Sequence, residues 1–111
     1  MVSKIVYRAG WYVDALALHL LDGSILAYGD SGGHAQDPVT LNLDEHLVSV
    51  EQVSAEKSRT YLGIRLIFST SHWRRLQLSG MVNRLAVMDM CKTYFNTYEL
   101  PYFVHVCDIT W

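Results

Sequence analysis

The dipeptide Asp22-Gly23 constrains the fold of this chain more than any other feature of its sequence. It stands between two short apolar runs, Val13 to Leu21 and Ile25 to Tyr28. A tight turn between antiparallel strands needs positive φ, which glycine adopts at no steric cost. The sequence therefore predicts a hairpin whose strands are joined by a two-residue turn at Asp22-Gly23.

Apolar and polar residues alternate along several further segments. The clearest alternation ends at Phe68, where one face of the expected strand is entirely apolar: Leu62, Ile64, Leu66 and Phe68. A period of two places successive side chains on opposite faces of a sheet. Shorter segments also predict strands: Ser3 to Tyr7, Val39 to Leu43, Leu47 to Val53 and Tyr102 to Val106. Strands and turns at roughly ten-residue spacing are typical of an antiparallel sandwich, barrel or prism.

Loops and turns are predicted between these strands. Arg8 to Gly10 ends the first strand, Gly29 to Pro38 is a loop by composition, and Asp44-Glu45 is a second turn. Gln52 to Arg59 carries enough charge to form a solvated loop. The strand from Val13 has leucines on one face and alanines with His19 on the other, so we expect it at an inner sheet face or covered on both sides.

The last third of the chain supports two interpretations. Trp73 to Leu78 can continue as a strand, whereas Met81 to Tyr98 has apolar residues at helical spacing and no internal glycine or proline. Periodicity alone favours a helix there. Leu100-Pro101 would end that element.

Composition narrows the class of protein. The chain has 111 residues, which fits one domain, and half of its residues are apolar. Its 9 basic and 11 acidic side chains leave a formal charge of −2, so no basic surface for nucleic acid is expected. No apolar run is long enough for a membrane span, and the N-terminus lacks the pattern of a signal peptide. We expect a soluble protein without membrane insertion, located in the cytoplasm or secreted by a route that needs no signal peptide.

Metal and cofactor sites are not predicted. The five histidines show neither the helical pairing nor the cysteine spacing of metal sites, and no glycine-rich loop precedes a helix. The two cysteines, Cys91 and Cys107, are expected as free buried thiols, with a disulfide as the alternative.

The pentapeptide from Gly29 to Gly33 spells the sequence around the nucleophile of chymotrypsin-like serine proteases. That chemistry needs a histidine base and a buried aspartate beside the serine. Only His19 precedes Ser31, in the middle of an apolar strand, where a core or inter-sheet histidine is the better interpretation. The sequence therefore does not predict an enzyme.

Two loops frame the predicted hairpin and carry the chemistry of a site for a small polar ligand. The first, from Gly10 to Asp14, contains a carboxylate and the aromatic residues Trp11 and Tyr12. The second contains Gly32 and Gly33, where the backbone can approach a ligand without a Cβ.

With these loops, residues 3 to 71 resemble the jacalin-related lectins of the mannose-specific type. The matching elements, in chain order, are Gly10-x-x-x-Asp14, Asp22-Gly23, Tyr28 to Gly33, Val39 to Val50, and Leu62 to Ser71 with its phenylalanine-x-threonine signature. The resemblance implies that residues 1–111 form a single all-β lectin domain, a β-prism I of three Greek-key sheets around a pseudo-threefold axis. It also favours strands over a helix in the last third.

The resemblance further implies a hexose site. Asp14 would accept hydrogen bonds from two sugar hydroxyls while the N–H groups of Trp11 and Tyr12 donate to the same oxygens, and Gly32 and Gly33 would line the opposite wall beside Gly10. A carboxylate next to N–H donors suits a hydroxyl, which donates once and accepts twice. An aromatic ring of this loop could also stack on the apolar face of the sugar.

The chain departs from the family pattern at both ends. The first family strand with its glycine-rich loop and a second Gly-x-x-x-Asp near the C-terminus are not found, so the site expected here is the one that some members carry as a secondary site. A prism without an outer strand has an open sheet edge, which predicts a homo-oligomer. The leading hypothesis is a lectin for mannose or glucose, with galactose as a further candidate, whose partners are glycans or glycoproteins. The alternative is an interaction or assembly module that does not bind sugar.

Overall fold

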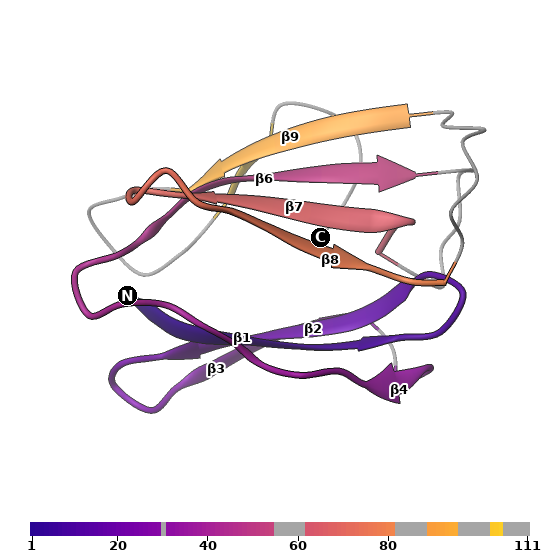
Figure 1. The fold of residues 1–111 in the computed structure, drawn as a ribbon, viewed down its shortest axis with the longest axis horizontal. Coiled ribbons are helices and arrows are strands. Elements are labelled where there is room, and N and C mark those ends of the chain that lie inside the picture. Colours follow the sequence, from indigo (N-terminus) through magenta and orange to yellow (C-terminus); the bar gives the residue numbers. More distant parts are fainter. Residues whose placement is uncertain (30, 55–61, 82–88, 96–102, 106–111) are drawn as a thin grey trace.

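The computed structural model describes residues 1–29, 31–54, 62–81, 89–95 and 103–105, and all regular secondary structure in these ranges is β-strand (Figure 1). The strands form two antiparallel five-stranded sheets that face each other. The prediction of an all-β protein is confirmed.

The first sheet is built around the N-terminal strand. Its strands are β1 (Val2–Ala9), β2 (Val13–Leu20), β3 (Ile25–Gly29), β4 (His34–Ala35) and β5 (Val39–Thr40). The order is β3-β2-β1, with the short β4 and β5 both paired to the free edge of β1. The prediction that Arg8 ends the first strand is wrong, because Arg8 pairs with Ala15 on one side and with Ala35 on the other.

The predicted hairpin is formed by β2 and β3, in which Leu16 faces Tyr28. Its turn is longer by one residue than predicted. The Gly23 N–H donates to the Leu20 carbonyl at 3.1 Å and the Leu20 N–H donates to the Ser24 carbonyl at 2.9 Å. Gly23 has φ of 92°, so glycine supplies the left-handed residue of a three-residue loop.

The second sheet repeats this strand pattern. Its strands are β6 (Leu47–Ser54), β7 (Arg65–Thr70), β8 (Arg75–Ser79), β9 (Asp89–Phe95) and β10 (Phe103–His105), in the order β10-β9-β6-β7-β8. In both sheets three consecutive strands lie side by side, and the chain then returns to the free edge of the first of them.

The sequence left a helix and strands as the two interpretations of the C-terminal third. Residues Asp89–Phe95 form strand β9, so the strand interpretation holds over those residues. Strand β9 pairs antiparallel with β6, where Thr93 faces Val50 and Cys91 faces Gln52. The edge of β6 offers hydrogen-bond partners to β9, so pairing overrides the helical periodicity there. The rest of that periodic segment, 82–88 and 96–98, lies outside the described residues.

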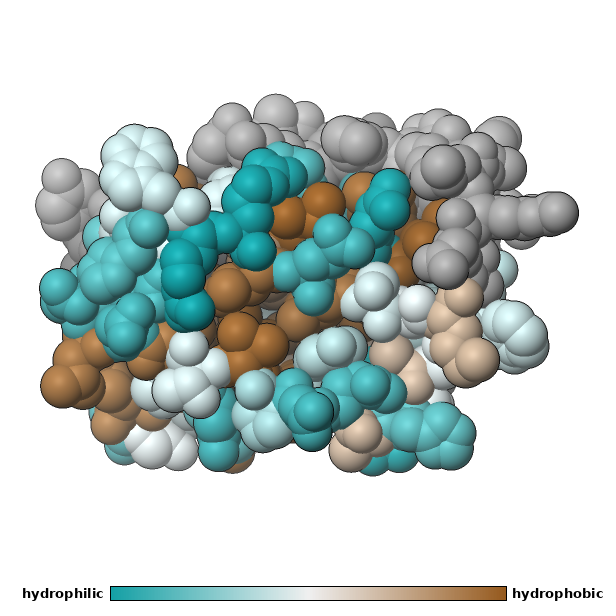
Figure 2. All heavy atoms as spheres, viewed as in Figure 1, coloured by the Kyte–Doolittle hydropathy of each residue, from teal (hydrophilic) through white to brown (hydrophobic). Residues whose placement is uncertain are grey.

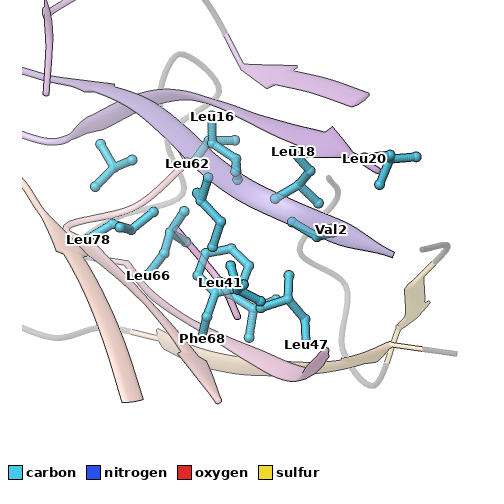
Figure 3. Close-up of a cluster of buried hydrophobic side chains, with 13 residues drawn as sticks. Val2, Leu16, Leu18, Leu20, Leu41, Leu47, Leu62, Leu66, Phe68 and Leu78 are labelled. Atoms are coloured by element: carbon cyan, nitrogen blue, oxygen red, sulfur yellow. The ribbon is translucent and has the colours of Figure 1, made fainter. Parts of the chain in front are cut away.

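The core lies between the two sheets (Figure 3). From the first sheet, Leu16, Leu18 and Leu20 point into it, as the alternation predicts. Opposite them, the predicted apolar face is buried in full, although β7 begins only at Arg65, after the first two of its members: Leu62, Ile64, Leu66 and Phe68. Hydrophobic side chains are accordingly visible between the sheets in the space-filling view (Figure 2).

Two sequence predictions are wrong where the chain passes from the first sheet to the second. The expected strand to Leu43 ends at Thr40, and Leu43 is 84% exposed, because a β-turn from Asn42 to Glu45 closes there. The predicted turn at Asp44-Glu45 is present, with Glu45 fully buried. The expected solvated loop is wrong over its first residues, since β6 extends to Ser54 and Gln52 is buried. The rest of that segment, 55–59, lies outside the described residues.

Candidate functional site

The two loops that the sequence singles out lie at the same end of the first sheet. The β1–β2 loop, 10–12, follows the pairing of Ala9 with Val13, and β3 reaches this end at Gly29, opposite Ala15. The chain then returns to β1, where His34 of β4 pairs with Ala9. The hairpin register therefore brings the two loops together around Asp14.

Three glycines, Gly10, Gly32 and Gly33, lie next to the Asp14 carboxylate. Its Oδ2 atom accepts a hydrogen bond from the Gly10 N–H at 3.1 Å. A Cβ on Gly33 would lie 2.5 Å from the same oxygen, and Gly33 has φ of 73°. A Cβ on Gly32 would lie 3.4 Å from Oδ1. The three predicted glycines thus contact or border this carboxylate, and Gly33 can be there only because it lacks a side chain.

The other carboxylate oxygen is available to a ligand. Asp14 is only half-buried, and no residue in the described part of the chain donates a hydrogen bond to its Oδ1 atom. A carboxylate oxygen with open lone pairs is a strong acceptor for a hydroxyl. Gly10 therefore holds the side chain through Oδ2, and among the described residues no hydrogen-bond donor reaches Oδ1.

Arg8 and Gln36 hold the glycine loop in place, and the sequence analysis missed both. The Arg8 guanidinium donates from Nη2 to the Gly33 carbonyl at 2.8 Å and from Nε to the Gly32 carbonyl at 3.2 Å. The Gln36 amide donates to the carbonyls of Ala9 and His34. The signal that could have identified Arg8 was a charged residue placed directly between a predicted strand and a glycine-bearing loop.

The two aromatic residues of the β1–β2 loop differ in exposure. Trp11 is 67% exposed, whereas Tyr12 is half-buried and its carbonyl accepts from the Gly10 N–H at 3.0 Å. The Trp11 backbone packs against Gly80, where a Cβ would lie 2.4 Å from the Trp11 carbonyl oxygen. Among the described residues, none accepts a hydrogen bond from the Trp11 N–H. Trp11 is therefore the residue of this loop that presents both a ring and an N–H donor.

The protease-like pentapeptide is placed with its serine at this same end. Ser31 is exposed, and Asp30 lies outside the described residues. His19 pairs with Ile25 at the turn end of the β2–β3 hairpin, whereas Gly29 is at the other end. The length of β3, ~13 Å at ~3.3 Å a residue, separates the two ends. His19 therefore lies too far from Ser31 to act as its base.

Metal binding finds no support in the part of the chain that the structure describes. Its His, Cys, Asp and Glu side chains do not form a group of three or more that could hold an ion. Cys107 lies outside the described residues, and the prediction of free thiols stays a prediction. Within the same ranges there is no helix that could cross a membrane.

A second polar cluster, which the sequence analysis also missed, lies at the opposite end of the sheets. Fully buried Glu45 accepts two hydrogen bonds from Arg74, each at 2.9 Å, and further ones from Thr70 and Asn42. The Arg74 hydrogen bond is the main cause that lowers the pKa of Glu45 from 4.5 to about 2. The cluster joins the turn after β5 to the β7–β8 hairpin, so it ties the two sheets together.

Comparison with known proteins finds no family model and no curated protein that matches this chain. The chemistry of the candidate site therefore rests on its geometry. It combines one oriented carboxylate, a free backbone donor and an exposed indole, which is a set suited to a neutral polyhydroxylated ligand.

Proposed function

We propose that this chain is a non-catalytic lectin that binds a hexose of the mannose or glucose type at the Gly10–Asp14 loop. The observation that carries the proposal is the Asp14 carboxylate, which Gly10 orients through Oδ2 and which no described residue uses through Oδ1. Gly32 and Gly33 leave the space beside it without side chains. Galactose is a further candidate ligand.

The proposed contacts follow from the hydrogen-bonding needs of a sugar. One hydroxyl donates to Asp14 Oδ1, while the Trp11 N–H donates to the same or a neighbouring oxygen. Tyr12 contributes backbone to the same wall, and Gly32 and Gly33 form the opposite wall. The exposed Trp11 indole stacks on the apolar face of the ring. A single shallow site of this kind binds monosaccharides weakly, and multivalency raises its avidity on glycoproteins.

The proposal includes the fold that the lectin resemblance implies. Residues 1–111 would form one β-prism I domain, with Greek-key sheets around a pseudo-threefold axis. Supporting it, the strand orders β3-β2-β1-β4 and β8-β7-β6-β9 follow one pattern, in which the fourth strand returns beside the first. The same connectivity in both sheets is the relation that internal symmetry requires.

A second candidate function is an assembly module that does not bind sugar. It is favoured by β3, an edge strand without a charged residue, whose Ile25 is 54% exposed. Leu21, in the turn before β3, is 53% exposed, and its N–H donates to the carbonyl of Met1, which is 47% exposed. Uncharged, unpaired edges invite pairing with another chain. Association through β3 is also the route by which a lectin of this kind would become a homo-oligomer.

Titration with methyl α-mannoside, followed by amide NMR shifts, tests the lectin proposal. We expect shifts at Trp11, Gly32 and Gly33 in the parent protein and at least a tenfold loss of affinity in Asp14→Ala. Asp14→Asn is the matched control for folding, because its amide oxygen can still accept from the Gly10 N–H. If no hexose shifts these signals in the parent, the assembly module becomes the better hypothesis. A Ser31 that reacts with a fluorophosphonate probe would instead point to an enzyme.

A further inference from the structure

Gly23 and Trp73 occupy the same position in two corresponding hairpins. In the β7–β8 turn the Trp73 N–H donates to the Thr70 carbonyl at 3.1 Å and the Thr70 N–H donates to the Arg74 carbonyl at 3.0 Å. The β2–β3 turn makes the same two bonds at Gly23, at 3.1 and 2.9 Å. Gly23 has φ of 92° and Trp73 has φ of 63°. One hairpin thus has glycine where the left-handed backbone favours it, and the other has tryptophan.

Burial of the Trp73 side chain does not compensate for this backbone conformation. Trp73 is 95% exposed, so its indole buries almost no surface. A bulky residue at positive φ is an outlier, because its Cβ crowds the backbone. Residues held in such conformations cluster at functional sites, where the surrounding structure maintains them. The backbone of this turn therefore presents the indole to solvent at a cost in stability.

The turn that carries Trp73 is fixed by the Glu45 cluster and is flanked by polar groups. Thr70 Oγ1 accepts from the backbone N–H groups of His72 and Arg74. The His72 side chain lies 3.2 Å from a carboxylate oxygen of Asp44, which is 82% exposed. On its other ring nitrogen, His72 lies 3.5 Å from the side-chain amide of Asn42. A carboxylate and a side-chain amide are thus held beside His72, the residue before Trp73, and the amide also donates to Glu45 Oε1 at 3.2 Å.

We propose that Trp73, Asp44 and Asn42 form a second carbohydrate-contacting site, at the end of the sheets opposite Asp14. The indole stacks on the apolar face of a sugar ring, and the Asp44 carboxylate and the Asn42 amide oxygen accept hydrogen bonds from its hydroxyls. Leu43, 84% exposed in the same turn as Asp44, adds apolar contact. These polar neighbours fit a sugar better than the apolar core of a protein interface.

The position of this second site gives it a consequence of its own. The β1–β2 loop and the β7–β8 turn lie at opposite ends of the paired sheets (Figure 1). One molecule would therefore contact two glycan chains and cross-link them without forming an oligomer. The inference shares only its class of ligand with the proposed lectin function, because no residue is common to the two sites.

A glycan array of mannose-, glucose- and galactose-terminated oligosaccharides, probed with the full chain, tests the inference. In the Asp14→Ala background we expect residual binding, and we expect Trp73→Gly to reduce that signal at least tenfold. Glycine suits the backbone of position 73, so the melting temperature should be unchanged or higher, and misfolding cannot explain the loss. Trp73→Tyr keeps an aromatic ring and should retain part of the signal.

The outcomes separate the two sites. If Asp14→Ala loses all binding, the first site is supported and the second is overturned. If the single variant Trp73→Gly loses all binding, the second site is supported and the first is overturned. The inference is overturned if the double variant Asp14→Ala/Trp73→Gly gives the same array signal as Asp14→Ala alone. It is likewise overturned if Trp73→Gly converts a dimer to a monomer in light scattering without changing the array, since a second copy would then be what covers the indole.

Discussion

Glu45 and Arg74 form a bidentate ion pair that bridges the two sheets. Arg74 Nε lies 2.9 Å from Glu45 Oε2, and Arg74 Nη2 lies 2.9 Å from Oε1. The Glu45 side chain is fully buried, whereas that of Arg74 is 40% exposed. Arg74 Nη2 also donates to the Thr40 carbonyl at 3.1 Å, so one guanidinium contacts both β5 and the turn that follows it. The pair holds the β7–β8 hairpin, whose turn carries the exposed Trp73, against the turn after β5.

Replacing Glu45 should destabilise the protein strongly. Glu45→Gln removes the charge and leaves the Arg74 guanidinium and the buried Thr70 hydroxyl imperfectly paired. We expect a loss of about 2–3 kcal/mol in the free energy of unfolding, at the low end for a buried pair because Arg74 retains contact with water. Urea denaturation measures it. Asp44→Asn, in the same turn but exposed, is the control and should change stability by less than about 0.5 kcal/mol. Equal effects of the two variants would contradict a special role for Glu45.

Stability should fall in acid because of the same carboxylate. The pKa of Glu45 is lowered in the folded state to about 2 from an ordinary value of 4.5, chiefly by the Arg74 hydrogen bond. The unfolded chain thus binds a proton at higher pH than the folded one, so this contribution is present above pH 4.5 and is lost as the pH falls toward 2. Denaturant midpoints at pH 6, 4.5, 3.5 and 2.5 should show it. The decline between pH 4.5 and 2.5 should be smaller in Glu45→Gln, and an identical decline would refute the assignment.

The two glycines of the β3–β4 loop should respond differently to alanine. In Gly33→Ala the new Cβ would clash with Asp14 Oδ2 and with the Ala9 backbone, at positive φ, so we expect a loss of about 2 kcal/mol or more. In Gly32→Ala the Cβ meets Asp14 at 3.4 Å, which the backbone tolerates. Thermal unfolding and the mannoside titration together separate them. Gly32→Ala should fold normally but bind mannoside more weakly, because its methyl group crowds Asp14 Oδ1.

The paired hairpins allow a stability test that involves no ligand. Gly23→Ala introduces a Cβ at left-handed φ and should cost about 1 kcal/mol, although open space surrounds that position. Trp73→Gly makes the reverse change and should not lower stability. Differential scanning calorimetry of both variants provides the measurement. A Trp73→Gly protein that melts well below the parent would show that the indole stabilises the fold, against the interpretation that it is held for a ligand.

Among the described residues β3 is an edge strand, and we predict that it mediates an association that a single charge should prevent. Ala27 is exposed in the middle of β3, and Lys at an edge strand blocks pairing with a second copy. We expect a dimer for the parent and a monomer for Ala27→Lys in size-exclusion chromatography with light scattering. Gln77→Lys places the same charge on the exposed face of edge strand β8 and is the control. A monomeric parent protein would refute oligomerisation through β3.

Local patterns were enough to predict the strands that pair with their neighbours in sequence. The hairpin around Gly23 and the buried face ending at Phe68 were predicted because a turn residue and a period of two act within a few residues. The exposure of Leu43 was missed, because the alternation that starts at Val39 continues into a turn. The Glu45 carboxylate stabilises that turn by accepting from the Asn42 N–H. The residues around Asp14 were identified individually, but their supports Arg8 and Gln36 were not.

By itself, the sequence determined an all-β chain with a glycine turn at position 23, one apolar face per long strand, and two glycine-bearing loops beside Asp14. These features depend on φ and on side-chain alternation, both of which are local. The tertiary structure decided that residues 89–95 form a strand, that Glu45 is buried and that the Asp14 carboxylate meets Gly33. Each of these depends on contacts between segments far apart in the chain. Their energies come from pairing and burial, and no local pattern records them.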